Sequence, residues 1–164
     1  MNVLLITEKL DMRDEISGLF HSRLLDFAND CTNLTVLVLE NKAHALPPSV
    51  KVISLGKEKG ASQFTYLWNF YKAIFGNATK YDRVFVHRSP IYIVLGGFFW
   101  RLMGKEVTLW YNHTFVDWKL RVSIFFVNHV LSTPGGFPLP TPKLRIIDGM
   151  HDLDTYVCDV RART

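Results

Sequence analysis

The sequence lacks the glycine-rich motifs with which many nucleotide-binding and hydrolytic α/β proteins hold or attack their substrates. The loop after the first predicted strand, Glu8–Arg13, contains no G-x-G-x-x-G, which argues against a dinucleotide site. The chain has no G-x-x-x-x-G-K-[ST], which argues against a P-loop NTPase, and no G-x-S-x-G, which argues against an ordinary α/β-hydrolase.

Cysteine is scarce, and the two thiols, Cys31 and Cys158, lie far apart in the chain. The sequence has no C-x-x-C pair and no Cys/His spacing of the kind that binds zinc. We therefore expect no metal site and no cofactor, and we expect both thiols to be reduced and buried.

Long apolar runs are also missing. A membrane-spanning helix needs roughly 18 consecutive apolar residues, and the longest candidate, Ile91–Trp100, is about half that length. The N-terminus enters the short apolar run Asn2–Thr7 without a basic leader, which does not fit a signal peptide. We therefore expect a cytoplasmic protein, with peripheral contact at the inner face of a membrane as its closest approach to lipid.

The composition that is present indicates one globular domain. The chain has 164 residues, of which 48% are hydrophobic, and a domain of that size can bury a core without disulfides or metal. Lys and Arg number 19 against 15 Asp and Glu, a net charge of +4. This positive field favours anionic partners such as sugar nucleotides or phospholipid surfaces. We expect no nucleic-acid partner, because no Arg-rich stripe or known binding motif is present.

Short apolar runs alternate with amphipathic segments along most of the chain, a pattern typical of strands buried on both faces of a parallel sheet. Strands are predicted over Asn2–Thr7, Leu34–Leu39, Val50–Leu55, Arg83–Val86, Val107–Trp110, Val130–Ser132 and Leu144–Ile147. Helices are predicted over Asp14–Ala28, Gln63–Phe75, residues 90–103 and Trp118–Phe126.

The helix over residues 90–103 has two notable local features. Ser89 and Pro90 predict an N-cap followed by proline at the first helical position. Gly96 and Gly97 each cost a helix interior roughly 1 kcal/mol relative to alanine, so we expect them to allow close packing of the helix on the sheet.

This alternation predicts an α/β fold, with a doubly wound, mostly parallel sheet in three layers, Rossmann-like and of strand order 3-2-1-4-5-6. In such sheets ligands bind outside the carboxyl ends of the strands. The functional residues should therefore lie in the loops after Thr7, Val86 and Trp110.

Polar side chains follow these strand ends. A histidine there could donate a hydrogen bond to a sugar hydroxyl or a phosphate, or exchange a proton near neutral pH. We predict that His113 is catalytic and that the substrate is bound by Ser17, Gly18, His87, Arg88, Asn112 and Thr114. Ser17 and Gly18 lie near the start of the first helix, where backbone N–H groups can face an anion. The alternative is that both histidines only make structural hydrogen bonds at strand or loop ends.

The segment Gln63–Phe75 is rich in aromatic residues. The simplest interpretation is core packing, because helices that cover a parallel sheet bury much of their surface. The alternative is a membrane-interface patch, since the aromatics lie on more than one face and Lys57, Lys59, Lys72 and Lys80 flank them.

Several segments, taken in order, resemble the N-terminal domain of GT-B glycosyltransferases, most closely glycosyltransferase family 4. Residues 81–87 (YDRVFVH) and 109–114 (LWYNHT) resemble two strands of that domain that end in histidine. Residues 127–132 (VNHVLS) and 146–150 (IIDGM) resemble its last strand and the turn that closes the domain, with Asn128 and Asp148 as departures. Ser17-Gly18 stands where the family has a Gly-Gly turn.

The resemblance implies a retaining hexosyl transfer from a nucleotide-sugar to a glycan or lipid-linked acceptor. Residues 1–156 would form the acceptor-side Rossmann-like domain, and 157–164 a tail or the start of an interdomain linker. In the family the glycine-rich turn lies near the donor phosphates, and the histidine of the fifth strand lines the cleft near the transferred sugar. These roles map onto Gly18 and His113, with Ser17, Asn112 and Thr114 beside them.

The family's second Rossmann domain binds the nucleotide and carries a Glu-x7-Glu motif, whereas here no glutamate lies beyond Glu106. We therefore expect a truncated domain that binds a nucleotide-sugar donor only with a second domain or chain and is inactive in transfer alone. The alternative is a non-catalytic module that binds sugar or lipid, or a membrane-surface adaptor. The missing glycine loop disfavours a stand-alone nucleotide-binding protein.

Overall fold

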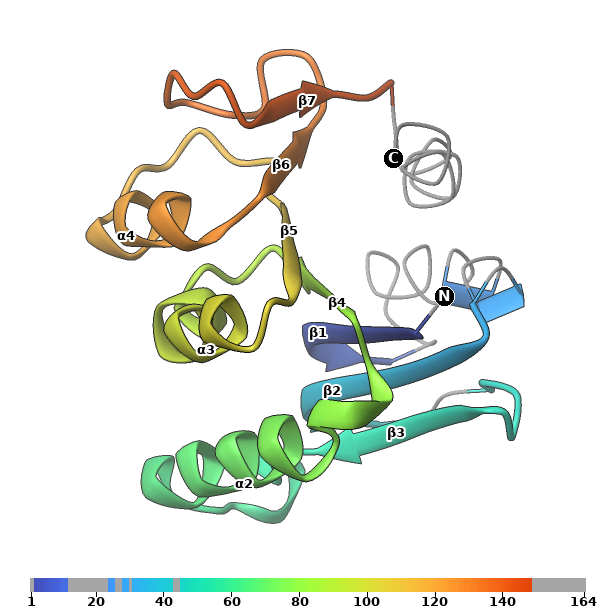
Figure 1. Ribbon diagram of the computed structural model, residues 1–164. Coiled ribbons are helices and arrows are strands. Elements are labelled where there is room, and N and C mark those ends of the chain that lie inside the picture. Colours follow the sequence, from blue (N-terminus) through green and yellow to red (C-terminus); the bar gives the residue numbers. More distant parts are fainter. Residues whose placement is uncertain (1, 12–23, 26–27, 30, 43–44, 149–164) are drawn as a thin grey trace.

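The computed structural model describes residues 2–11, 24–25, 28–29, 31–42 and 45–148 (Figure 1). Its strands are β1 (Asn2–Leu10), β2 (Asn33–Asn41), β3 (Val50–Ser54), β4 (Arg83–His87), β5 (Glu106–Trp110), β6 (His129–Ser132) and β7 (Leu144–Ile146). Its helices are α2 (Gln63–Gly76), α3 (Ile91–Leu102) and α4 (Trp118–Phe126), with short 3-10 turns at Lys57–Lys59 and Ala78–Lys80.

The seven strands form one parallel sheet in the order β3-β2-β1-β4-β5-β6-β7. The predicted α/β Rossmann-like fold and strand order are confirmed. The prediction that Glu8 begins a loop is wrong, because β1 continues to Leu10 and pairs there with Asn41 of β2. Leu10 is buried, and this burial together with the ladder to β2 extends the strand past its polar residues.

Successive residues of the strands enter two separate cores, one on each face of the sheet. In β1, Leu4 and Ile6 belong to the core under the helices, whereas Val3 and Leu5 belong to the core on the opposite face. This alternation explains why the strands are continuous apolar runs, since side chains on both sides of the pleat are covered.

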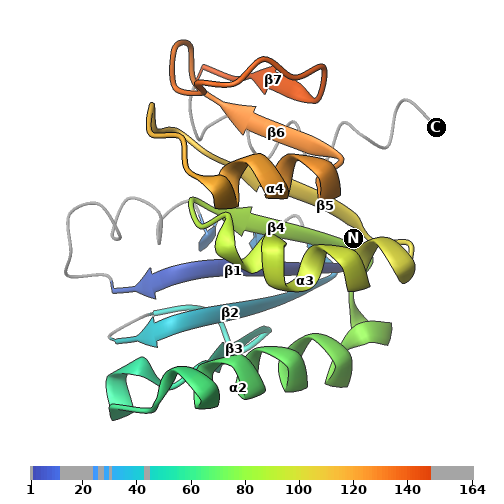
Figure 2. The ribbon, with the colours of Figure 1, turned by 90° about the vertical axis from the view of Figure 1, so that its left-hand side faces the viewer.

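Helices α2, α3 and α4 all cover one face of the sheet (Figures 1 and 2). On the other face Leu24 is fully buried and Ala28 packs against the same core. The described residues 24–25 and 28–29 are helical, as predicted for the segment that ends at Ala28. The rest of the predicted helix Asp14–Ala28 lies outside the described residues.

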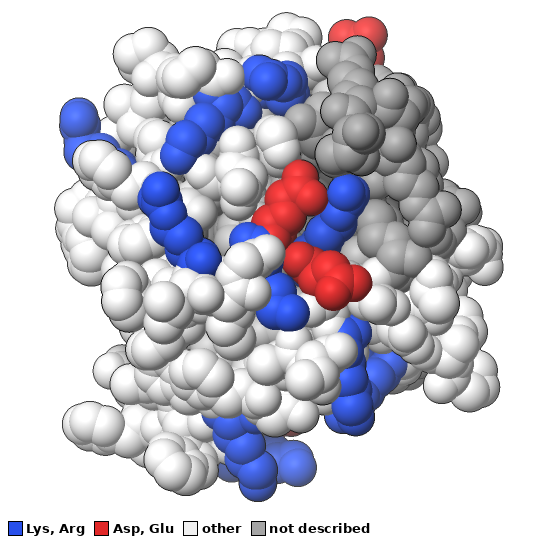
Figure 3. Space-filling model, in the orientation of Figure 1, with Lys and Arg blue, Asp and Glu red and all other residues white. Residues whose placement is uncertain are grey.

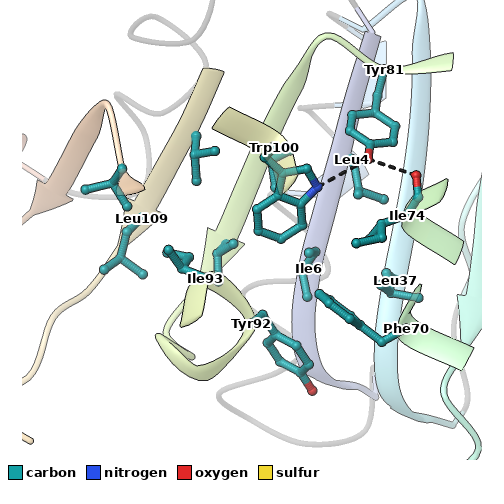
Figure 4. Packing of buried hydrophobic residues seen from close by; sticks show 14 of the residues in the cluster. Leu4, Ile6, Leu37, Phe70, Ile74, Tyr81, Tyr92, Ile93, Trp100 and Leu109 are labelled. Carbon is teal, nitrogen blue, oxygen red and sulfur yellow. Dashed lines mark hydrogen bonds between the residues drawn. The ribbon is translucent and has the colours of Figure 1, made fainter. Parts of the chain in front are cut away.

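A buried hydrogen-bonded pair anchors α3 to the core (Figure 4). The indole Nε1 of Trp100 donates to the hydroxyl of Tyr81 at 3.2 Å, and that hydroxyl donates to the carbonyl of Ile74 in α2 at 3.0 Å. Burial raises the pKa of Tyr81, which keeps its proton available for this bond. The two polar atoms are thus paired where water does not reach them.

The structure corrects both predictions about the start and middle of α3. Its N-cap is Pro90, which makes no side-chain cap, and the Ser89 hydroxyl instead donates to Glu8 Oε1 at 2.6 Å. A Cβ at Gly97 would lie 2.6 Å from Cβ of Phe126, so this glycine allows α3 to approach α4 rather than the sheet. A Cβ at Gly96 would meet the ring of Trp100 instead.

The aromatic helix α2 buries only Phe70, Ala73 and Ile74. Phe64 and Trp68 are 85% and 72% exposed, so core packing accounts for one stripe of this helix and not for its other aromatics. Within the described ranges no helix is long and apolar enough to cross a membrane. Cys31 is half-buried rather than buried as predicted, and Cys158 lies outside the described residues.

Candidate functional site

The loops that follow β4 and β5 bring Arg88 and His113 together at the carboxyl edge of the sheet. Nε and Nη2 of Arg88 lie 3.1 and 2.8 Å from Nε2 of His113. The strands themselves are neighbours, with His87 opposite Trp110, and the Arg88 backbone N–H donates to the Trp110 carbonyl at 2.8 Å. The two residues therefore meet because a crossover joins adjacent strands, although 25 positions separate them.

Arg88 has a backbone φ of 66°, in the left-handed region that favours glycine. It is the single non-glycine residue with a positive φ among those the structure describes. Such a conformation costs on the order of 1 kcal/mol and is retained where the surroundings enforce it, often at functional sites. Here it turns the chain directly after β4, and the side chain reaches His113.

The contact with Arg88 determines which ring nitrogen of His113 carries the proton. A guanidinium only donates, so Nε2 must offer its lone pair, and the neutral imidazole carries its proton on Nδ1. Burial and the charge of Arg88 lower the pKa of His113, and Glu8 opposes them by raising it. His113 is exposed, so its neutral ring can donate from Nδ1 to a ligand.

His87 lies behind this pair as the last residue of β4. It is 8% exposed, and its Nδ1 is 3.2 Å from the hydroxyl of Thr7 on β1. Burial, reinforced by Arg88 and His113, lowers the pKa of His87 to about 3, so the ring is neutral at physiological pH. His87 therefore links β4 to β1 through Thr7, and it lies buried behind Arg88 and His113.

Glu8 adds a carboxylate to the same edge. It is exposed, and its Oε1 accepts the 2.6 Å hydrogen bond from Ser89, which fixes it beside the β4 loop. We predicted no functional residue at this position from the sequence. The strand-end rule that selected the two histidines would have found Glu8, because it directly follows Thr7.

Asn112 lies next to His113 and is fixed by the loop after β6. Its Oδ1 accepts a hydrogen bond from the Thr133 hydroxyl at 2.6 Å. Gly136 of that loop packs so closely that a Cβ on it would overlap Oδ1 of Asn112. Thr133 and Gly136 are thus further residues that sequence reasoning missed, and they hold the Asn112 amide in one orientation.

The structure gathers some of the predicted site residues and leaves others undecided. Arg88 and His113 are in contact, and His87 is close enough for its pKa to respond to both. Asn112 and Thr114 are exposed on either side of His113. Ser17 and Gly18 lie outside the described residues. No group of three or more His, Cys, Asp or Glu suited to a metal ion occurs in the described part of the chain.

Taken together, the edge offers a guanidinium, an imidazole N–H, a carboxylate and an amide within one cluster, which we call the edge cluster: Glu8, Arg88, Asn112 and His113. Cationic and neutral donors beside one acceptor can bind a ligand that carries both hydroxyl and anionic groups. Sugar phosphates have this combination of groups.

Comparison with known proteins finds no matching family model and no matching curated protein. Among solved structures, Anabaena HepE in complex with UDP is similar over 98% of this chain and 50% of its own, at 13% identity and a TM-score of 0.55. MurG of Acinetobacter baumannii is similar over 90% of this chain and 45% of its own, at 13% identity and a TM-score of 0.55.

The lipopolysaccharide outer core galactosyltransferase WaaB in its apo form is similar over 89% of this chain and 45% of its own, at 12% identity and a TM-score of 0.56. These structural neighbours are GT-B glycosyltransferases. The chain spans about half the length of each. Its fold therefore resembles one half of a GT-B enzyme.

Proposed function

We propose that this chain is the acceptor-side half of a glycosyltransferase that uses a nucleotide-sugar donor. The observation that carries the proposal is the contact between Arg88 and His113 at the carboxyl edge of a sheet whose fold matches half of a GT-B enzyme. In open α/β sheets this edge is where ligands bind. The structural neighbour HepE is in complex with UDP, which supports a donor of the same class.

In this proposal His113 donates from Nδ1 to a hydroxyl of the sugar being transferred or of the acceptor. The remaining N–H groups of Arg88 face the negative charge that develops on the departing phosphate, since charge-assisted donors are the strongest available. Glu8 has one oxygen bonded to Ser89 and can accept a hydrogen bond or a proton from the acceptor hydroxyl with the other.

The donor phosphates would be bound mostly by a second domain or a separate chain, with Ser17 and Gly18 near them. The motif resemblance to family 4 adds retention of configuration at the sugar carbon to the proposal. It also adds a glycan or lipid-linked acceptor, which would place the chain at the cytoplasmic face of a membrane. Residues 1–164 by themselves would supply few of the phosphate contacts, so we expect no sugar transfer until a donor-binding domain or chain is added.

The test is to mix the chain with candidate donor-binding domains and assay transfer from UDP- and GDP-sugars. The variants His113→Gln and Arg88→Gln should each lower kcat/KM at least tenfold, about 1.4 kcal/mol of transition-state stabilisation. Lys59→Gln, an exposed lysine away from the edge cluster, is the matched control. Tight binding of a nucleotide-sugar by the chain alone, or no complex with any donor domain, would contradict the proposal.

A second candidate function is a non-catalytic adaptor that binds lipid or sugar at a membrane surface. The exposure of Phe64 and Trp68 on α2 favours it, because these residues leave apolar surface uncovered. An adaptor would keep its ligand binding in the His113→Gln variant, whereas the transferase half would lose activity. The variant Trp68→Ser/Phe75→Ser tests the adaptor role, which predicts loss of liposome binding with retention of the fold.

A further inference from the structure

A pocket of about 470 Å³ opens where β5, β6 and β7 begin, at the end of the strands remote from the edge cluster. Helices α3 and α4 end beside it, so the pocket lies where the helix layer meets the amino edge of the sheet (Figure 2). The side chains that carry its chemistry are Arg101, Lys105, Glu106, Phe125, Asn128 and Lys143.

Two cations of the pocket, Arg101 and Lys143, cap the end of α4. Arg101 Nη1 donates to the Phe125 carbonyl at 3.0 Å, and Lys143 Nζ donates to the Ile124 carbonyl at 2.6 Å. Carbonyls in the last turn of a helix need such partners, because the helix has no further N–H to pair with them. The end of a helix carries roughly half a negative charge, so two full positive charges exceed what capping requires.

Neither Arg101 nor Lys143 forms an ion pair with a carboxylate in the part of the chain that the structure describes. Burial and the charge of Arg101 lower the pKa of Lys143, so the two cations are close enough to repel each other. A guanidinium and an ammonium each carry several N–H donors, and one bond to a carbonyl leaves most of them available. The pair can therefore donate to an anion without giving up the helix cap.

The other two charged residues of the pocket already have partners. Glu106 Oε2 is 3.1 Å from Nε of Arg83, and Glu106 Oε1 is 3.1 Å from Nε2 of His129. Lys105 Nζ donates to two main-chain carbonyls before β4, at 2.7 and 2.6 Å. Figure 3 views the molecule from the side where the strands begin, and it shows blue side chains to the left of and above the red atoms at its centre. Since Arg83 offsets Glu106, the pocket has a surplus of positive charge.

Asn128 adds a neutral donor beside these charges. Its Oδ1 accepts a hydrogen bond from the main-chain N–H of Val107 at 2.9 Å, which fixes the amide near the start of β5. The amide nitrogen Nδ2 keeps its own N–H groups to donate, and Asn128 is exposed, so these groups can reach a ligand. An aspartate here could accept the same N–H, but it would bring a negative charge into the pocket.

Phe125 gives the pocket an apolar wall. Its ring is 71% exposed, and Phe126 beside it also lines the pocket and is half-buried. Sites for small molecules combine apolar and aromatic walls with a few polar groups, and their volumes are roughly 300–1,000 Å³. The size and lining of this pocket therefore suit a molecule that is larger than a simple ion and partly apolar.

We propose that this pocket binds a small soluble molecule that carries a phosphate monoester and a flat apolar part. The phosphate accepts hydrogen bonds from Arg101, Lys143 and the Asn128 amide, while the apolar part lies on Phe125. A phosphate monoester carries about two negative charges at pH 7 and three acceptor oxygens, which matches two cations, whereas a carboxylate would balance only one. Hydrogen bonds in which both groups are ionised are the strongest available.

The proposal stands apart from the glycosyltransferase function, because the two sites lie at opposite ends of the strands. Strand β5 has five residues and spans roughly 17 Å at its usual rise. A molecule in the pocket would therefore leave the edge cluster open to its own ligand. It would also join the ends of α3 and α4 to the segment before β7, so it should raise the melting temperature of the fold.

The test is an NMR titration of the 164-residue chain with phenyl phosphate, inorganic phosphate and phenol. We expect phenyl phosphate to shift the backbone amides of residues 104–106 and 125–128, which line the pocket. It should bind about fivefold more tightly than inorganic phosphate because its ring adds apolar contact. Phenol, which has the ring without the charge, should cause no shift at these amides.

Four variants assign the binding to particular side chains. Asn128→Asp and Arg101→Gln/Lys143→Gln should each weaken phenyl phosphate binding about tenfold or more. Phe125→Ser should remove the preference for phenyl phosphate and leave the affinity for inorganic phosphate unchanged. Arg121→Gln, which changes an exposed cation of α4 outside the pocket, is the matched control and should bind like the wild type.

Circular dichroism separates lost binding from lost folding, and Asn128→Asp keeps an oxygen for the Val107 N–H. If that variant does not fold, Arg101→Gln/Lys143→Gln decides alone. The proposal would be overturned if phenyl phosphate shifted no amide of the pocket, if phenol bound equally well, or if the folded pocket variants kept full affinity. Sedimentation with phosphatidylglycerol vesicles by a chain that binds no soluble phosphate would also overturn it, because the phosphate would then belong to a lipid.

Discussion

The guanidinium of Arg88 donates to Nε2 of His113 from a backbone position that a residue with a side chain rarely adopts. The contact favours the neutral histidine with its proton on Nδ1. It also holds the positive charge of Arg88 at the carboxyl ends of the strands, where parallel sheets bind ligands. The strained conformation of Arg88 and the protonation state of His113 are thus two aspects of one arrangement, and each can be measured alone.

The pKa of His113 should depend on Arg88. The variant Arg88→Ala removes a positive charge that lowers this pKa and leaves Glu8, which raises it. The midpoint of the His113 ring titration, followed by NMR, should therefore move upward toward the ordinary value near 6.5. An unchanged midpoint would mean that the two side chains are not in contact in solution.

The backbone strain at Arg88 predicts an unusual order of stability between two small replacements. Both Arg88→Gly and Arg88→Ala remove the guanidinium, but only glycine adopts a φ of 66° without steric cost. We expect the glycine variant to be more stable than the alanine variant by about 1 kcal/mol in urea unfolding. Equal stabilities, or a more stable alanine variant, would show that this turn relaxes in solution.

The buried His87 should make the protein sensitive to acid. Burial lowers its pKa to about 3 in the native state, while in the unfolded chain the pKa is near 6.5. The unfolded state therefore takes up a proton first, and stability that is complete above about pH 6.5 falls as the pH drops toward 3. The free energy of unfolding should lose about 2 kcal/mol between roughly pH 6.5 and pH 5 from this group alone.

The variant His87→Gln has no titratable side chain at this position. Its difference from the wild type therefore gives the contribution of His87 to the pH dependence of stability. Its unfolding free energy should fall less steeply over the same interval, about pH 6.5 to pH 5, than that of the wild type, whatever its value at neutral pH. Parallel pH profiles for the two proteins would show that His87 is accessible to protons in the native state.

Close packing between α3 and α4 predicts that alanine is harmful at Gly97. A Cβ there would lie 2.6 Å from Cβ of Phe126, and overpacking of that kind costs about 1–3 kcal/mol, more than the helix gains from alanine. Gly76→Ala is the matched control, because a Cβ at this helical glycine meets nothing within 4 Å. We expect the melting temperature to fall for Gly97→Ala and to stay or rise for Gly76→Ala.

Much of the fold follows from local pattern. The seven apolar runs, bounded by polar loops, predict the strands to within a few residues, and α4 begins and ends at the predicted residues, Trp118 and Phe126. The chain order of strands and helices leads to the parallel sheet because crossovers are right-handed and join neighbouring strands. These regularities act over short separations, and a single sequence displays them.

The predictions fail where a residue far away in the sequence determines the local structure. Ser89 has the residue type of an N-cap, but Glu8, 81 positions away, accepts its hydroxyl. From the sequence we expect Gly97 to pack against the sheet, but in the structure it packs against Phe126 of α4. Glu8 itself lies in a strand because Leu10 is buried beside β2.

The sequence by itself determined the fold class, the strand order and the edge of the sheet at which Arg88 and His113 lie. Only the tertiary structure decided that these two side chains touch, that His87 is buried behind them, and that three cations share a pocket at the opposite edge. The physical reason is that the spacing of apolar residues shows only which local element a segment forms and which of its faces is buried. Hydrogen bonds, pKa shifts and pockets depend on atoms that only folding brings within a few ångströms of one another.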